Sequence, residues 1–125
     1  MILGTGLDLA EVDRIAKMLE KEHARSRIFT AGENAHIDQR GAQSAAGIWA
    51  AKEAVAKALG TGFSAFGPWD IEIYWNEAGQ PLCRLQNGAL ERHKSIGGGR
   101  IHISITHIST TAAAMAILTD EGELD

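Results

Sequence analysis

Apolar and polar residues alternate over several short stretches of the chain, and this alternation is the pattern of β-strands. In residues 2–9 the leucines share one face, whereas the opposite face carries two glycines and then the carboxylate of Asp8. A turn at residues 76–81 joins two of the predicted strands into a hairpin. The further strands predicted from this pattern cover residues 70–75, 82–85, 100–108 and 111–118.

Between the strands, apolar residues recur every three or four positions, as they do in amphipathic helices. This spacing predicts helices near residues 11–22 and 44–59, and further helices are predicted near residues 30–41, where the apolar face is weak, and 89–95. Thr30 and Glu33 form a capping-box pattern at the start of the second helix, and Gly41 marks its end. Helices segregated from strands that are joined by short turns predict an α+β fold with a mainly antiparallel sheet.

The length and composition of the chain fit a single domain. It has 125 residues, of which 45% are hydrophobic, so it can bury one modest core. The prediction is one domain over residues 1–119 and an acidic, frayed tail over residues 120–125. The single cysteine, Cys83, cannot form an internal disulfide, and no segment has the pattern of a signal peptide or membrane span. We therefore expect a soluble, cytoplasmic protein, and the net charge of −4 argues against nucleic-acid binding.

Two carboxylates stand out as candidates for chemistry. Asp8 ends the glycine-bearing face of the first strand, where a ligand or another backbone could approach closely. The alternative is that Asp8 caps the helix that follows, and spacing alone favours that alternative. Glu53 lies among small and aromatic residues of the alanine-rich third helix rather than among other charges. Together the two residues suit Mg²⁺, which proteins commonly hold with one or two carboxylates while water and substrate phosphates supply the other ligands.

Lysines and glycines near Glu53 could bind phosphate. Lys57 follows Glu53 by one helical turn, and alone this pair is most simply a surface salt bridge. Lys52 and Lys57 could instead neutralise phosphate oxygens during transfer, although helix lysines often serve only solubility. Gly60-Thr61-Gly62 either stops the helix or brings backbone amides near a phosphate. His107 ends the clearest strand, where a partly buried structural histidine is the default interpretation.

Basic residues cluster between positions 14 and 27, within and after the first predicted helix. If that helix is long enough, one basic stripe is formed by Arg14, Lys17, Lys21 and Arg25. The stripe is either an ordinary solvated face, since two glutamates are nearby, or a docking surface for an acidic partner.

In this order, the segments resemble the holo-[acyl-carrier-protein] synthase family, the small bacterial phosphopantetheinyl transferases. The most specific block runs from Trp49 through Lys52-Glu53 to Gly60-Thr61-Gly62. The segments that carry the resemblance before it are Gly6-Leu7-Asp8-Leu9, Arg14-Ile15 and Arg27-Ile28-Phe29-Thr30 with Glu33. Those after it are Asp70-Ile71-Glu72-Ile73, Gly79-Gln80-Pro81 and the strand from Ile101 to His107. The resemblance covers nearly the whole chain.

The resemblance implies a Mg²⁺-dependent transfer of 4′-phosphopantetheine from coenzyme A to a serine of an acyl carrier protein, releasing adenosine 3′,5′-bisphosphate. Asp8 and Glu53 would bind the metal, and Glu53 would also accept the serine proton, directly or through a bound water. Lys52 and Lys57 would contact phosphate or stabilise charge that builds on it. The adenosine-diphosphate end would be lined by Gly60, Thr61 and Gly62, and His107 would lie near the 3′-phosphate.

For assembly and partners, the resemblance implies a homotrimer whose active sites are shared between neighbouring subunits. Arg14, with Lys17 and Lys21, would dock the acidic recognition helix of the carrier protein. The chain departs from the family pattern at Ile48, because many members carry Arg before the aromatic residue of the Lys-Glu block. His23-Ala24 also replaces an Arg-Phe pair that is common in the family.

Three other functions compete with the transferase. A non-catalytic module that binds coenzyme A or carrier protein would explain Ile48, but the retained Asp8, Glu53 and Lys57 weigh against it. A phosphohydrolase would need no protein acceptor. An interaction module built on the basic stripe would tolerate the loss of both carboxylates. Magnesium-dependent turnover separates the transferase from the binding module.

Overall fold

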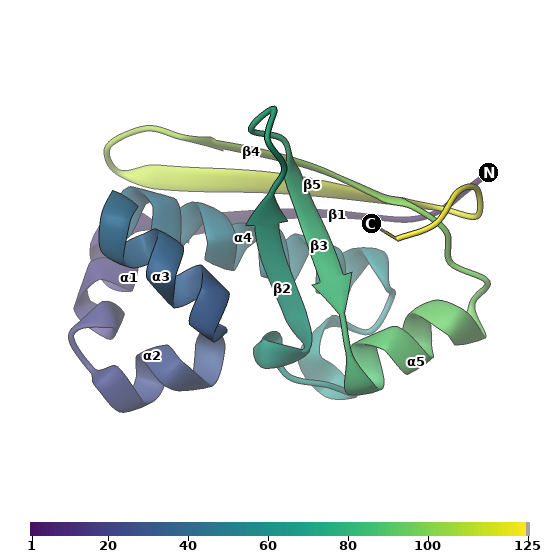
Figure 1. Ribbon diagram of the computed structural model, residues 1–125, viewed down its shortest axis with the longest axis horizontal. Helices are drawn as coiled ribbons and strands as arrows, with labels where there is room; N and C mark the ends of the chain where they lie inside the picture. The colour runs from purple at the N-terminus through teal and green to yellow at the C-terminus, as the bar shows by residue number, and fades with distance from the viewer. Residues whose placement is uncertain (125) are drawn as a thin grey trace.

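One long helix, α4, lies against a three-stranded antiparallel sheet and is flanked by a two-stranded hairpin in the computed structural model, which describes residues 1–124 (Figure 1). The helices are α1 (Val12–Leu19), α2 (Glu22–Ile28), α3 (Ala31–Arg40), α4 (Ala42–Ala58) and α5 (Asn87–Ser95). The strands are β1 (Ile2–Glu11), β2 (Ile71–Trp75), β3 (Pro81–Leu85), β4 (Ile101–His107) and β5 (Thr111–Thr119). Two short 3₁₀ turns, Gly62–Ser64 and Pro68–Asp70, connect α4 to β2.

The predicted α+β class is confirmed, and all strand pairings are antiparallel. The larger sheet has the order β1-β5-β4, so the first and last strands of the chain are neighbours. The smaller sheet is the predicted hairpin of β2 and β3. The capping box is also present, because the Thr30 hydroxyl accepts from the Glu33 amide and Glu33 accepts from the Thr30 amide, and Gly41 ends α3 as predicted.

The glycine-bearing face of β1 is occupied by the backbone of α4. An ideal Cβ at Gly4 would lie 2.0 Å from the carbonyl oxygen of Ala58, so no side chain larger than hydrogen fits there. On the neighbouring strand, the residues that face α4 are alanines, at positions 112, 114 and 116, all buried. Small residues on both strands therefore let α4 approach the sheet closely and bring its side chains to the end of β1.

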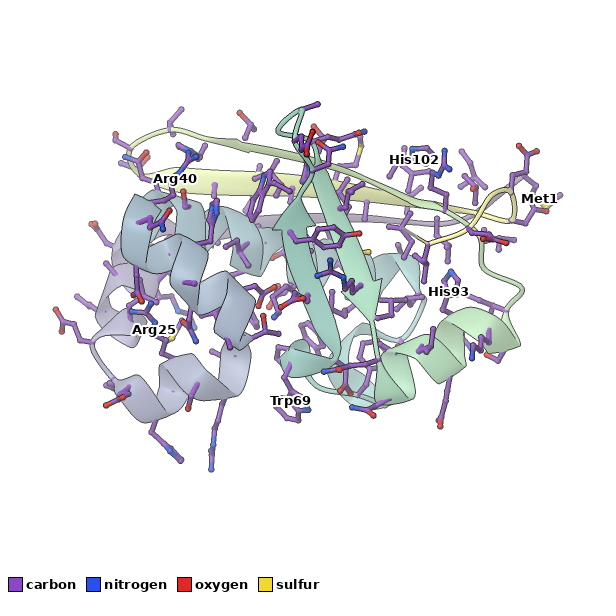
Figure 2. The ribbon with its side chains drawn as sticks, viewed as in Figure 1. Met1, Arg25, Arg40, Trp69, His93 and His102 are labelled. Atoms are coloured by element: carbon purple, nitrogen blue, oxygen red, sulfur yellow. The ribbon has the colours of Figure 1, made fainter. Side chains whose placement is uncertain are left out.

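The first predicted helix is wrong in its extent. We expected one helix over residues 11–22 and a continuous basic stripe, but α1 ends at Leu19 and α2 begins after an extended Lys21. A straight helix would carry Phe29 away from the core by roughly 15 Å beyond Leu19, whereas the break returns Phe29 to a buried site. Arg25 is also removed from the stripe, because its guanidinium turns inward to Asn34 and Asp38 of α3 (Figure 2).

The acidic C-terminal segment is tied to the sheet where it was expected to fray. The Met1 ammonium lies 2.7 Å from the Asp120 carboxylate, and the Arg100 amide donates to the Glu121 carbonyl at 2.8 Å. Asp125, the last residue of the predicted tail, lies outside the described residues. No helix within residues 1–124 combines the length and hydropathy needed to cross a membrane.

On the face of the large sheet turned away from α4, β1 and β5 carry apolar side chains that are uncovered in the single chain. Leu7 and Leu9 of β1 expose 66% and 67% of their surfaces, and the neighbouring Met115 of β5 exposes 43%. The register places Leu7 opposite Met115, so these side chains form one patch across two strands. Contiguous apolar patches of this kind mark interaction surfaces.

Candidate active site

The side chains of Asp8 in β1 and Lys57 in α4 meet between the sheet and the helix. The Lys57 ammonium donates to Asp8 Oδ1 at 2.9 Å and to the Leu7 carbonyl at 3.0 Å. This contact excludes the two simpler interpretations of the sequence. Asp8 does not cap α1, whose N-cap is Glu11 without a side-chain hydrogen bond. Within the described residues, the salt-bridge partner of Lys57 is Asp8 rather than Glu53.

Glu53 lies one helical turn before Lys57 and faces the same aspartate. Partial burial and the neighbouring carboxylate of Asp8 raise the pKa of Glu53 to about 7. The charges of Lys57 and Arg14 oppose this rise. Two carboxylates thus face each other beside a half-exposed ammonium, and one of them titrates close to neutral pH.

This carboxylate pair suits a divalent cation. Asp8 Oδ2 is buried and has no hydrogen-bond partner among the described residues, so one oxygen of the pair is left for a ligand. Within residues 1–124 no group of three or more His, Cys, Asp or Glu side chains could hold a metal by itself. A site with only two carboxylates fits Mg²⁺, which takes its other ligands from water and substrate phosphates, and fits zinc poorly.

A cleft opens beside Glu53, between the first turns of α1 and the middle of α4. Its volume is about 570 Å³, and Arg14 and Glu53 are its charged side chains together with Glu11. Its apolar wall consists of Ile15, Met18, Ile28 and Trp49. The cleft is therefore open to solvent at a charged edge and apolar within, and it is wide enough to hold an extended organic chain.

Lys52 does not reach this cleft, and the prediction that it contacts phosphate is not supported by its position. Its side chain is completely buried, and its ammonium lies 2.5 Å from Glu33 Oε1. Burial lowers the pKa of Lys52 and raises the pKa of Glu33, while the attraction between them opposes both changes. The sequence contained a signal for this pairing in the capping-box glutamate, which was assigned only to the start of α3.

The Gly60-Thr61-Gly62 segment follows α4 directly, one turn beyond Lys57. Gly60 and Gly62 have φ values of 89° and 58°, which favour glycine, so the segment does stop the helix. Arg92 of α5 restrains the start of this segment, because Arg92 Nε donates a hydrogen bond to the Leu59 carbonyl oxygen at 2.8 Å. Both sequence interpretations survive, since a helix stop can also present amides to a phosphate.

His107 lies in a different pocket from Glu53. This second pocket, of about 550 Å³, is lined by residues of α3, α4, the β2–β3 turn and β4, including Arg40, Ser44 and His107. Its wall contains His36 stacked on Trp75 with ring centroids 4.1 Å apart. Within one chain, therefore, the structure does not bring His107 together with Asp8 and Glu53. His102 is remote from this pocket, because it and Arg40 lie toward opposite ends of the sheet (Figure 2).

Arg40 is the cation that sequence reasoning missed. It occupies the last turn of α3, where a basic residue is commonly explained by the helix dipole alone. Its exposed side chain shares the pocket with Ile48, which is fully buried and contributes only wall. Position 48, where many family members carry Arg, therefore has no charge in this chain, but Arg40 of α3 places a positive charge in the same pocket. The pKa of His36 is lowered chiefly by burial of its ring and further by the positive charge of Arg40.

Comparison with known proteins identifies the family. A sequence model of the 4′-phosphopantetheinyl transferase superfamily matches residues 4–116. The holo-[acyl-carrier-protein] synthase of Alkaliphilus metalliredigens is 46% identical over 122 residues, which cover 95% of this chain and 100% of that protein. The chain belongs to the holo-[acyl-carrier-protein] synthase family.

Solved holo-[acyl-carrier-protein] synthases share the fold over nearly the full chain. The Neisseria meningitidis structure has a TM-score of 0.86 at 28% identity and covers 95% of this chain and 99% of its own. The Bacillus anthracis structure, a complex with CoA (3′,5′-ADP), has a TM-score of 0.80 at 32% identity and covers 97% and 99%. The family expected from the sequence blocks and its fold are therefore confirmed, and the chain is an enzyme of this transferase family.

Proposed function

We propose that this chain transfers 4′-phosphopantetheine from coenzyme A to a serine of an apo acyl carrier protein in a Mg²⁺-dependent reaction that releases adenosine 3′,5′-bisphosphate. The observation that carries the proposal is the meeting of Asp8, Glu53 and Lys57, of which Glu53 also lines the cleft. Two carboxylates for a metal and one ammonium for phosphate are the groups that phosphoryl transfer requires. A relative of this family was solved with CoA, which supports the choice of substrate.

Asp8 and Glu53 would hold the magnesium ion, and Lys57 would face the phosphate oxygens. When bound, the metal would neutralise the pyrophosphate and the charge that develops on the transferred phosphorus. Lys57 is half exposed, so its ammonium can turn toward a substrate while it remains close to Asp8. Lys52 takes no part in this contact because it is buried.

In the chemical step, the carrier serine oxygen forms a bond to the phosphorus that bears pantetheine. The bond from that phosphorus to the bridging oxygen breaks, and adenosine 3′,5′-bisphosphate leaves with that oxygen. Glu53 would accept the serine proton, directly or through a bound water. The apolar wall of the cleft beside Glu53 would accommodate the pantetheine arm.

The nucleotide end of coenzyme A would use two sets of residues. Gly60, Thr61 and Gly62 would present their backbone to the diphosphate, next to Lys57. His107 and Arg40 would receive the 3′-phosphate, and Arg40 would supply the positive charge that Ile48 lacks. A guanidinium is well suited to this task because it donates two parallel hydrogen bonds to a phosphate.

A homotrimer with shared active sites would reconcile these two sets. His107 and the carboxylate pair occupy separate pockets of one chain, so one coenzyme A would contact both only at a junction between subunits. The uncovered patch of Leu7, Leu9 and Met115 gives a second copy an apolar surface to bind. This patch lies on β1, the strand that carries Asp8, although on its opposite face, so assembly would involve the strand that holds the metal site.

The carrier protein would dock on the exposed basic residues of α1 and the following turn. Arg14, Lys17 and Lys21 are exposed, and Arg14 also lines the cleft, so a carrier bound there would bring its serine toward Glu53. Since the break after Leu19 removes Arg25 from this surface, the proposed docking site is shorter than the stripe read from the sequence. We propose a cytoplasmic setting, where coenzyme A and carrier proteins are both available.

Intact-mass measurement of a carrier protein tests the proposal directly. The protein is incubated with Mg²⁺, coenzyme A and an apo carrier, and the expected result is a gain of one phosphopantetheine that a chelator abolishes. Glu53→Gln should remove most of this activity and leave the fold unchanged. If coenzyme A binds but no tested carrier gains mass, the non-catalytic binding module is the better assignment.

A further inference from the structure

Glu33 and Lys52 form a completely buried ion pair that joins three elements. Glu33 Oε1 accepts from the Lys52 ammonium at 2.5 Å and from the Thr30 amide at 2.9 Å. Its other oxygen accepts from the Ile73 amide of β2 at 2.7 Å. The start of α3, the middle of α4 and strand β2 are thus held by one carboxylate whose hydrogen-bonding oxygens are both used.

Stability alone does not account for such a pair. The cost of removing two charges from water commonly equals or exceeds their attraction, so apolar residues of similar size often stabilise a fold as well or better. A buried ion pair with fixed hydrogen bonds does fix the orientation of the lysine side chain, because the ammonium must point at one carboxylate. In α4 this orientation is tied to the active site, because Lys52 is the residue before Glu53.

Helix geometry shows what the pair fixes. Successive residues of a helix are separated by about 100°, so Lys52 and Ala54 project to nearly opposite sides of α4 and Glu53 lies between them. Ala54 lies on the β1 side, where its carbonyl oxygen would be 1.8 Å from a Cβ at Gly6. The helix is therefore held at β1 by close packing and at α3 and β2 by the ion pair, with Glu53 directed toward the cleft.

We propose that Glu33 and Lys52 are positioning residues for the active site, which fix the rotation of α4 about its own axis and thereby the orientation of Glu53 toward Asp8. This inference rests on the proposed role of Glu53 at the metal. At a side-chain distance of about 5–6 Å from the helix axis, a rotation of about 10° moves a carboxylate by about 1 Å. A displacement of that size can reduce a catalysed rate by about 100-fold.

The double variant E33Q/K52M tests the role of the charges without removing the fold. The Glu33→Gln change keeps an acceptor for the capping box, and the Lys52→Met change keeps an unbranched chain of similar length. The control is Leu85→Ala, which removes buried side-chain volume from β3, a strand that contributes no residue to the ion pair or to the proposed metal site. Thermal unfolding compares the two variants with the wild type, and titration calorimetry measures Mg²⁺ binding to each free protein.

We expect the double variant to unfold at or above the temperature of Leu85→Ala, yet to bind Mg²⁺ at least 10-fold more weakly and to turn over at least 10-fold more slowly. Leu85→Ala should keep wild-type Mg²⁺ affinity. Wild-type affinity and turnover in a folded E33Q/K52M protein would overturn the positioning role.

If the double variant does not fold, Lys52→Arg gives the deciding measurement. Arg retains the charge, but its longer guanidinium must displace α4 to reach the same carboxylate, so Mg²⁺ affinity should fall while the ion pair persists. An unchanged affinity in that variant would overturn the proposal. Failure of the proposed function is recognised separately, since the wild type itself would then neither bind Mg²⁺ nor modify a carrier.

Discussion

The carbonyl oxygen of Ala54 occupies the space that a side chain at Gly6 would need, because an ideal Cβ there lies 1.8 Å from it. This contact sets the distance between β1, which carries Asp8, and α4, which carries Glu53. Gly6→Ala should separate the two elements, costing about 3 kcal/mol of unfolding free energy and most Mg²⁺ binding. Thermal unfolding measures the loss, with the outward-facing Thr5→Ala as control. Wild-type stability of Gly6→Ala would contradict this packing.

Lys57→Met should separate catalysis from stability. Because the Lys57 side chain is 51% exposed, its pairing with Asp8 contributes less than about 1 kcal/mol to folding. Loss of the ammonium that faces phosphate should nevertheless lower kcat about 100-fold. Steady-state kinetics and thermal unfolding check the two expectations, and the exposed Lys94→Met of α5 is the matched control. A kcat within twofold of the wild type would remove Lys57 from the reaction.

The stability of the metal-free protein should fall as the pH rises from about 4.5 to about 7. The fold raises the pKa of Glu53 from 4.5 to about 7, chiefly through burial and then through Asp8. The folded state therefore binds more protons than the unfolded state in this window, and ionisation of Glu53 disfavours folding. Unfolding temperatures measured in chelator across this range should show a slope that Glu53→Gln reduces. Equal slopes in both proteins would assign the effect to other groups.

Arg40→Ala tests the proposed 3′-phosphate contact. We expect the KM for coenzyme A to rise at least 10-fold, because the charged hydrogen bonds of one guanidinium are lost. Dephospho-coenzyme A lacks the 3′-phosphate and should be used equally well by Arg40→Ala and the wild type. An increase in KM for both substrates would show that Arg40 acts on the fold of the pocket and not on that phosphate.

The double substitution K17E/K21E tests carrier docking. Both lysines are exposed, and complementary charge mainly accelerates encounter, so kcat/KM for the carrier should fall about 10-fold at low salt. The KM for coenzyme A should stay unchanged. The difference from the wild type should shrink as salt is added, because exposed charges are screened. A salt-independent defect would indicate that the variant damages the cleft instead.

Much of the fold could be predicted because it depends on local patterns. Alternation identified the strands, and the glycine face of β1 indicated a close approach that turned out to be the backbone of α4. Asp8, Glu53 and Lys57 stood out as candidates, but their spacing alone favoured a helix cap and a surface salt bridge, and the family resemblance supplied their expected roles. Their meeting in space followed from the antiparallel sheet and from the crossing of β1 by α4, which periodicity alone does not specify.

The features that the sequence did not reveal all depend on tertiary contacts. The helix breaks after Leu19 because Phe29 must return to the core, and no proline or glycine marks that point. Lys52 looked equivalent to Lys57, but only the packing of α3 determines that one is buried and the other exposed. Arg40 acquires its interest from the distant His107, since the two share a pocket only after the chain has folded.

The alanines of β5 that face α4 limit which substitutions the protein can accept along this strand. The side chains at positions 112, 114 and 116 are small and buried. A larger side chain at one of these positions would clash with α4, whereas a smaller one would lose little packing energy. A larger residue at one of these positions should displace α4 by a fraction of an ångström and lower the free energy of unfolding. The variant should remain folded at low temperature but unfold at a lower temperature than the wild type. Temperature-sensitive alleles are therefore expected to concentrate along this strand, at positions that carry no reactive group themselves but pair with the strands of Asp8 and His107.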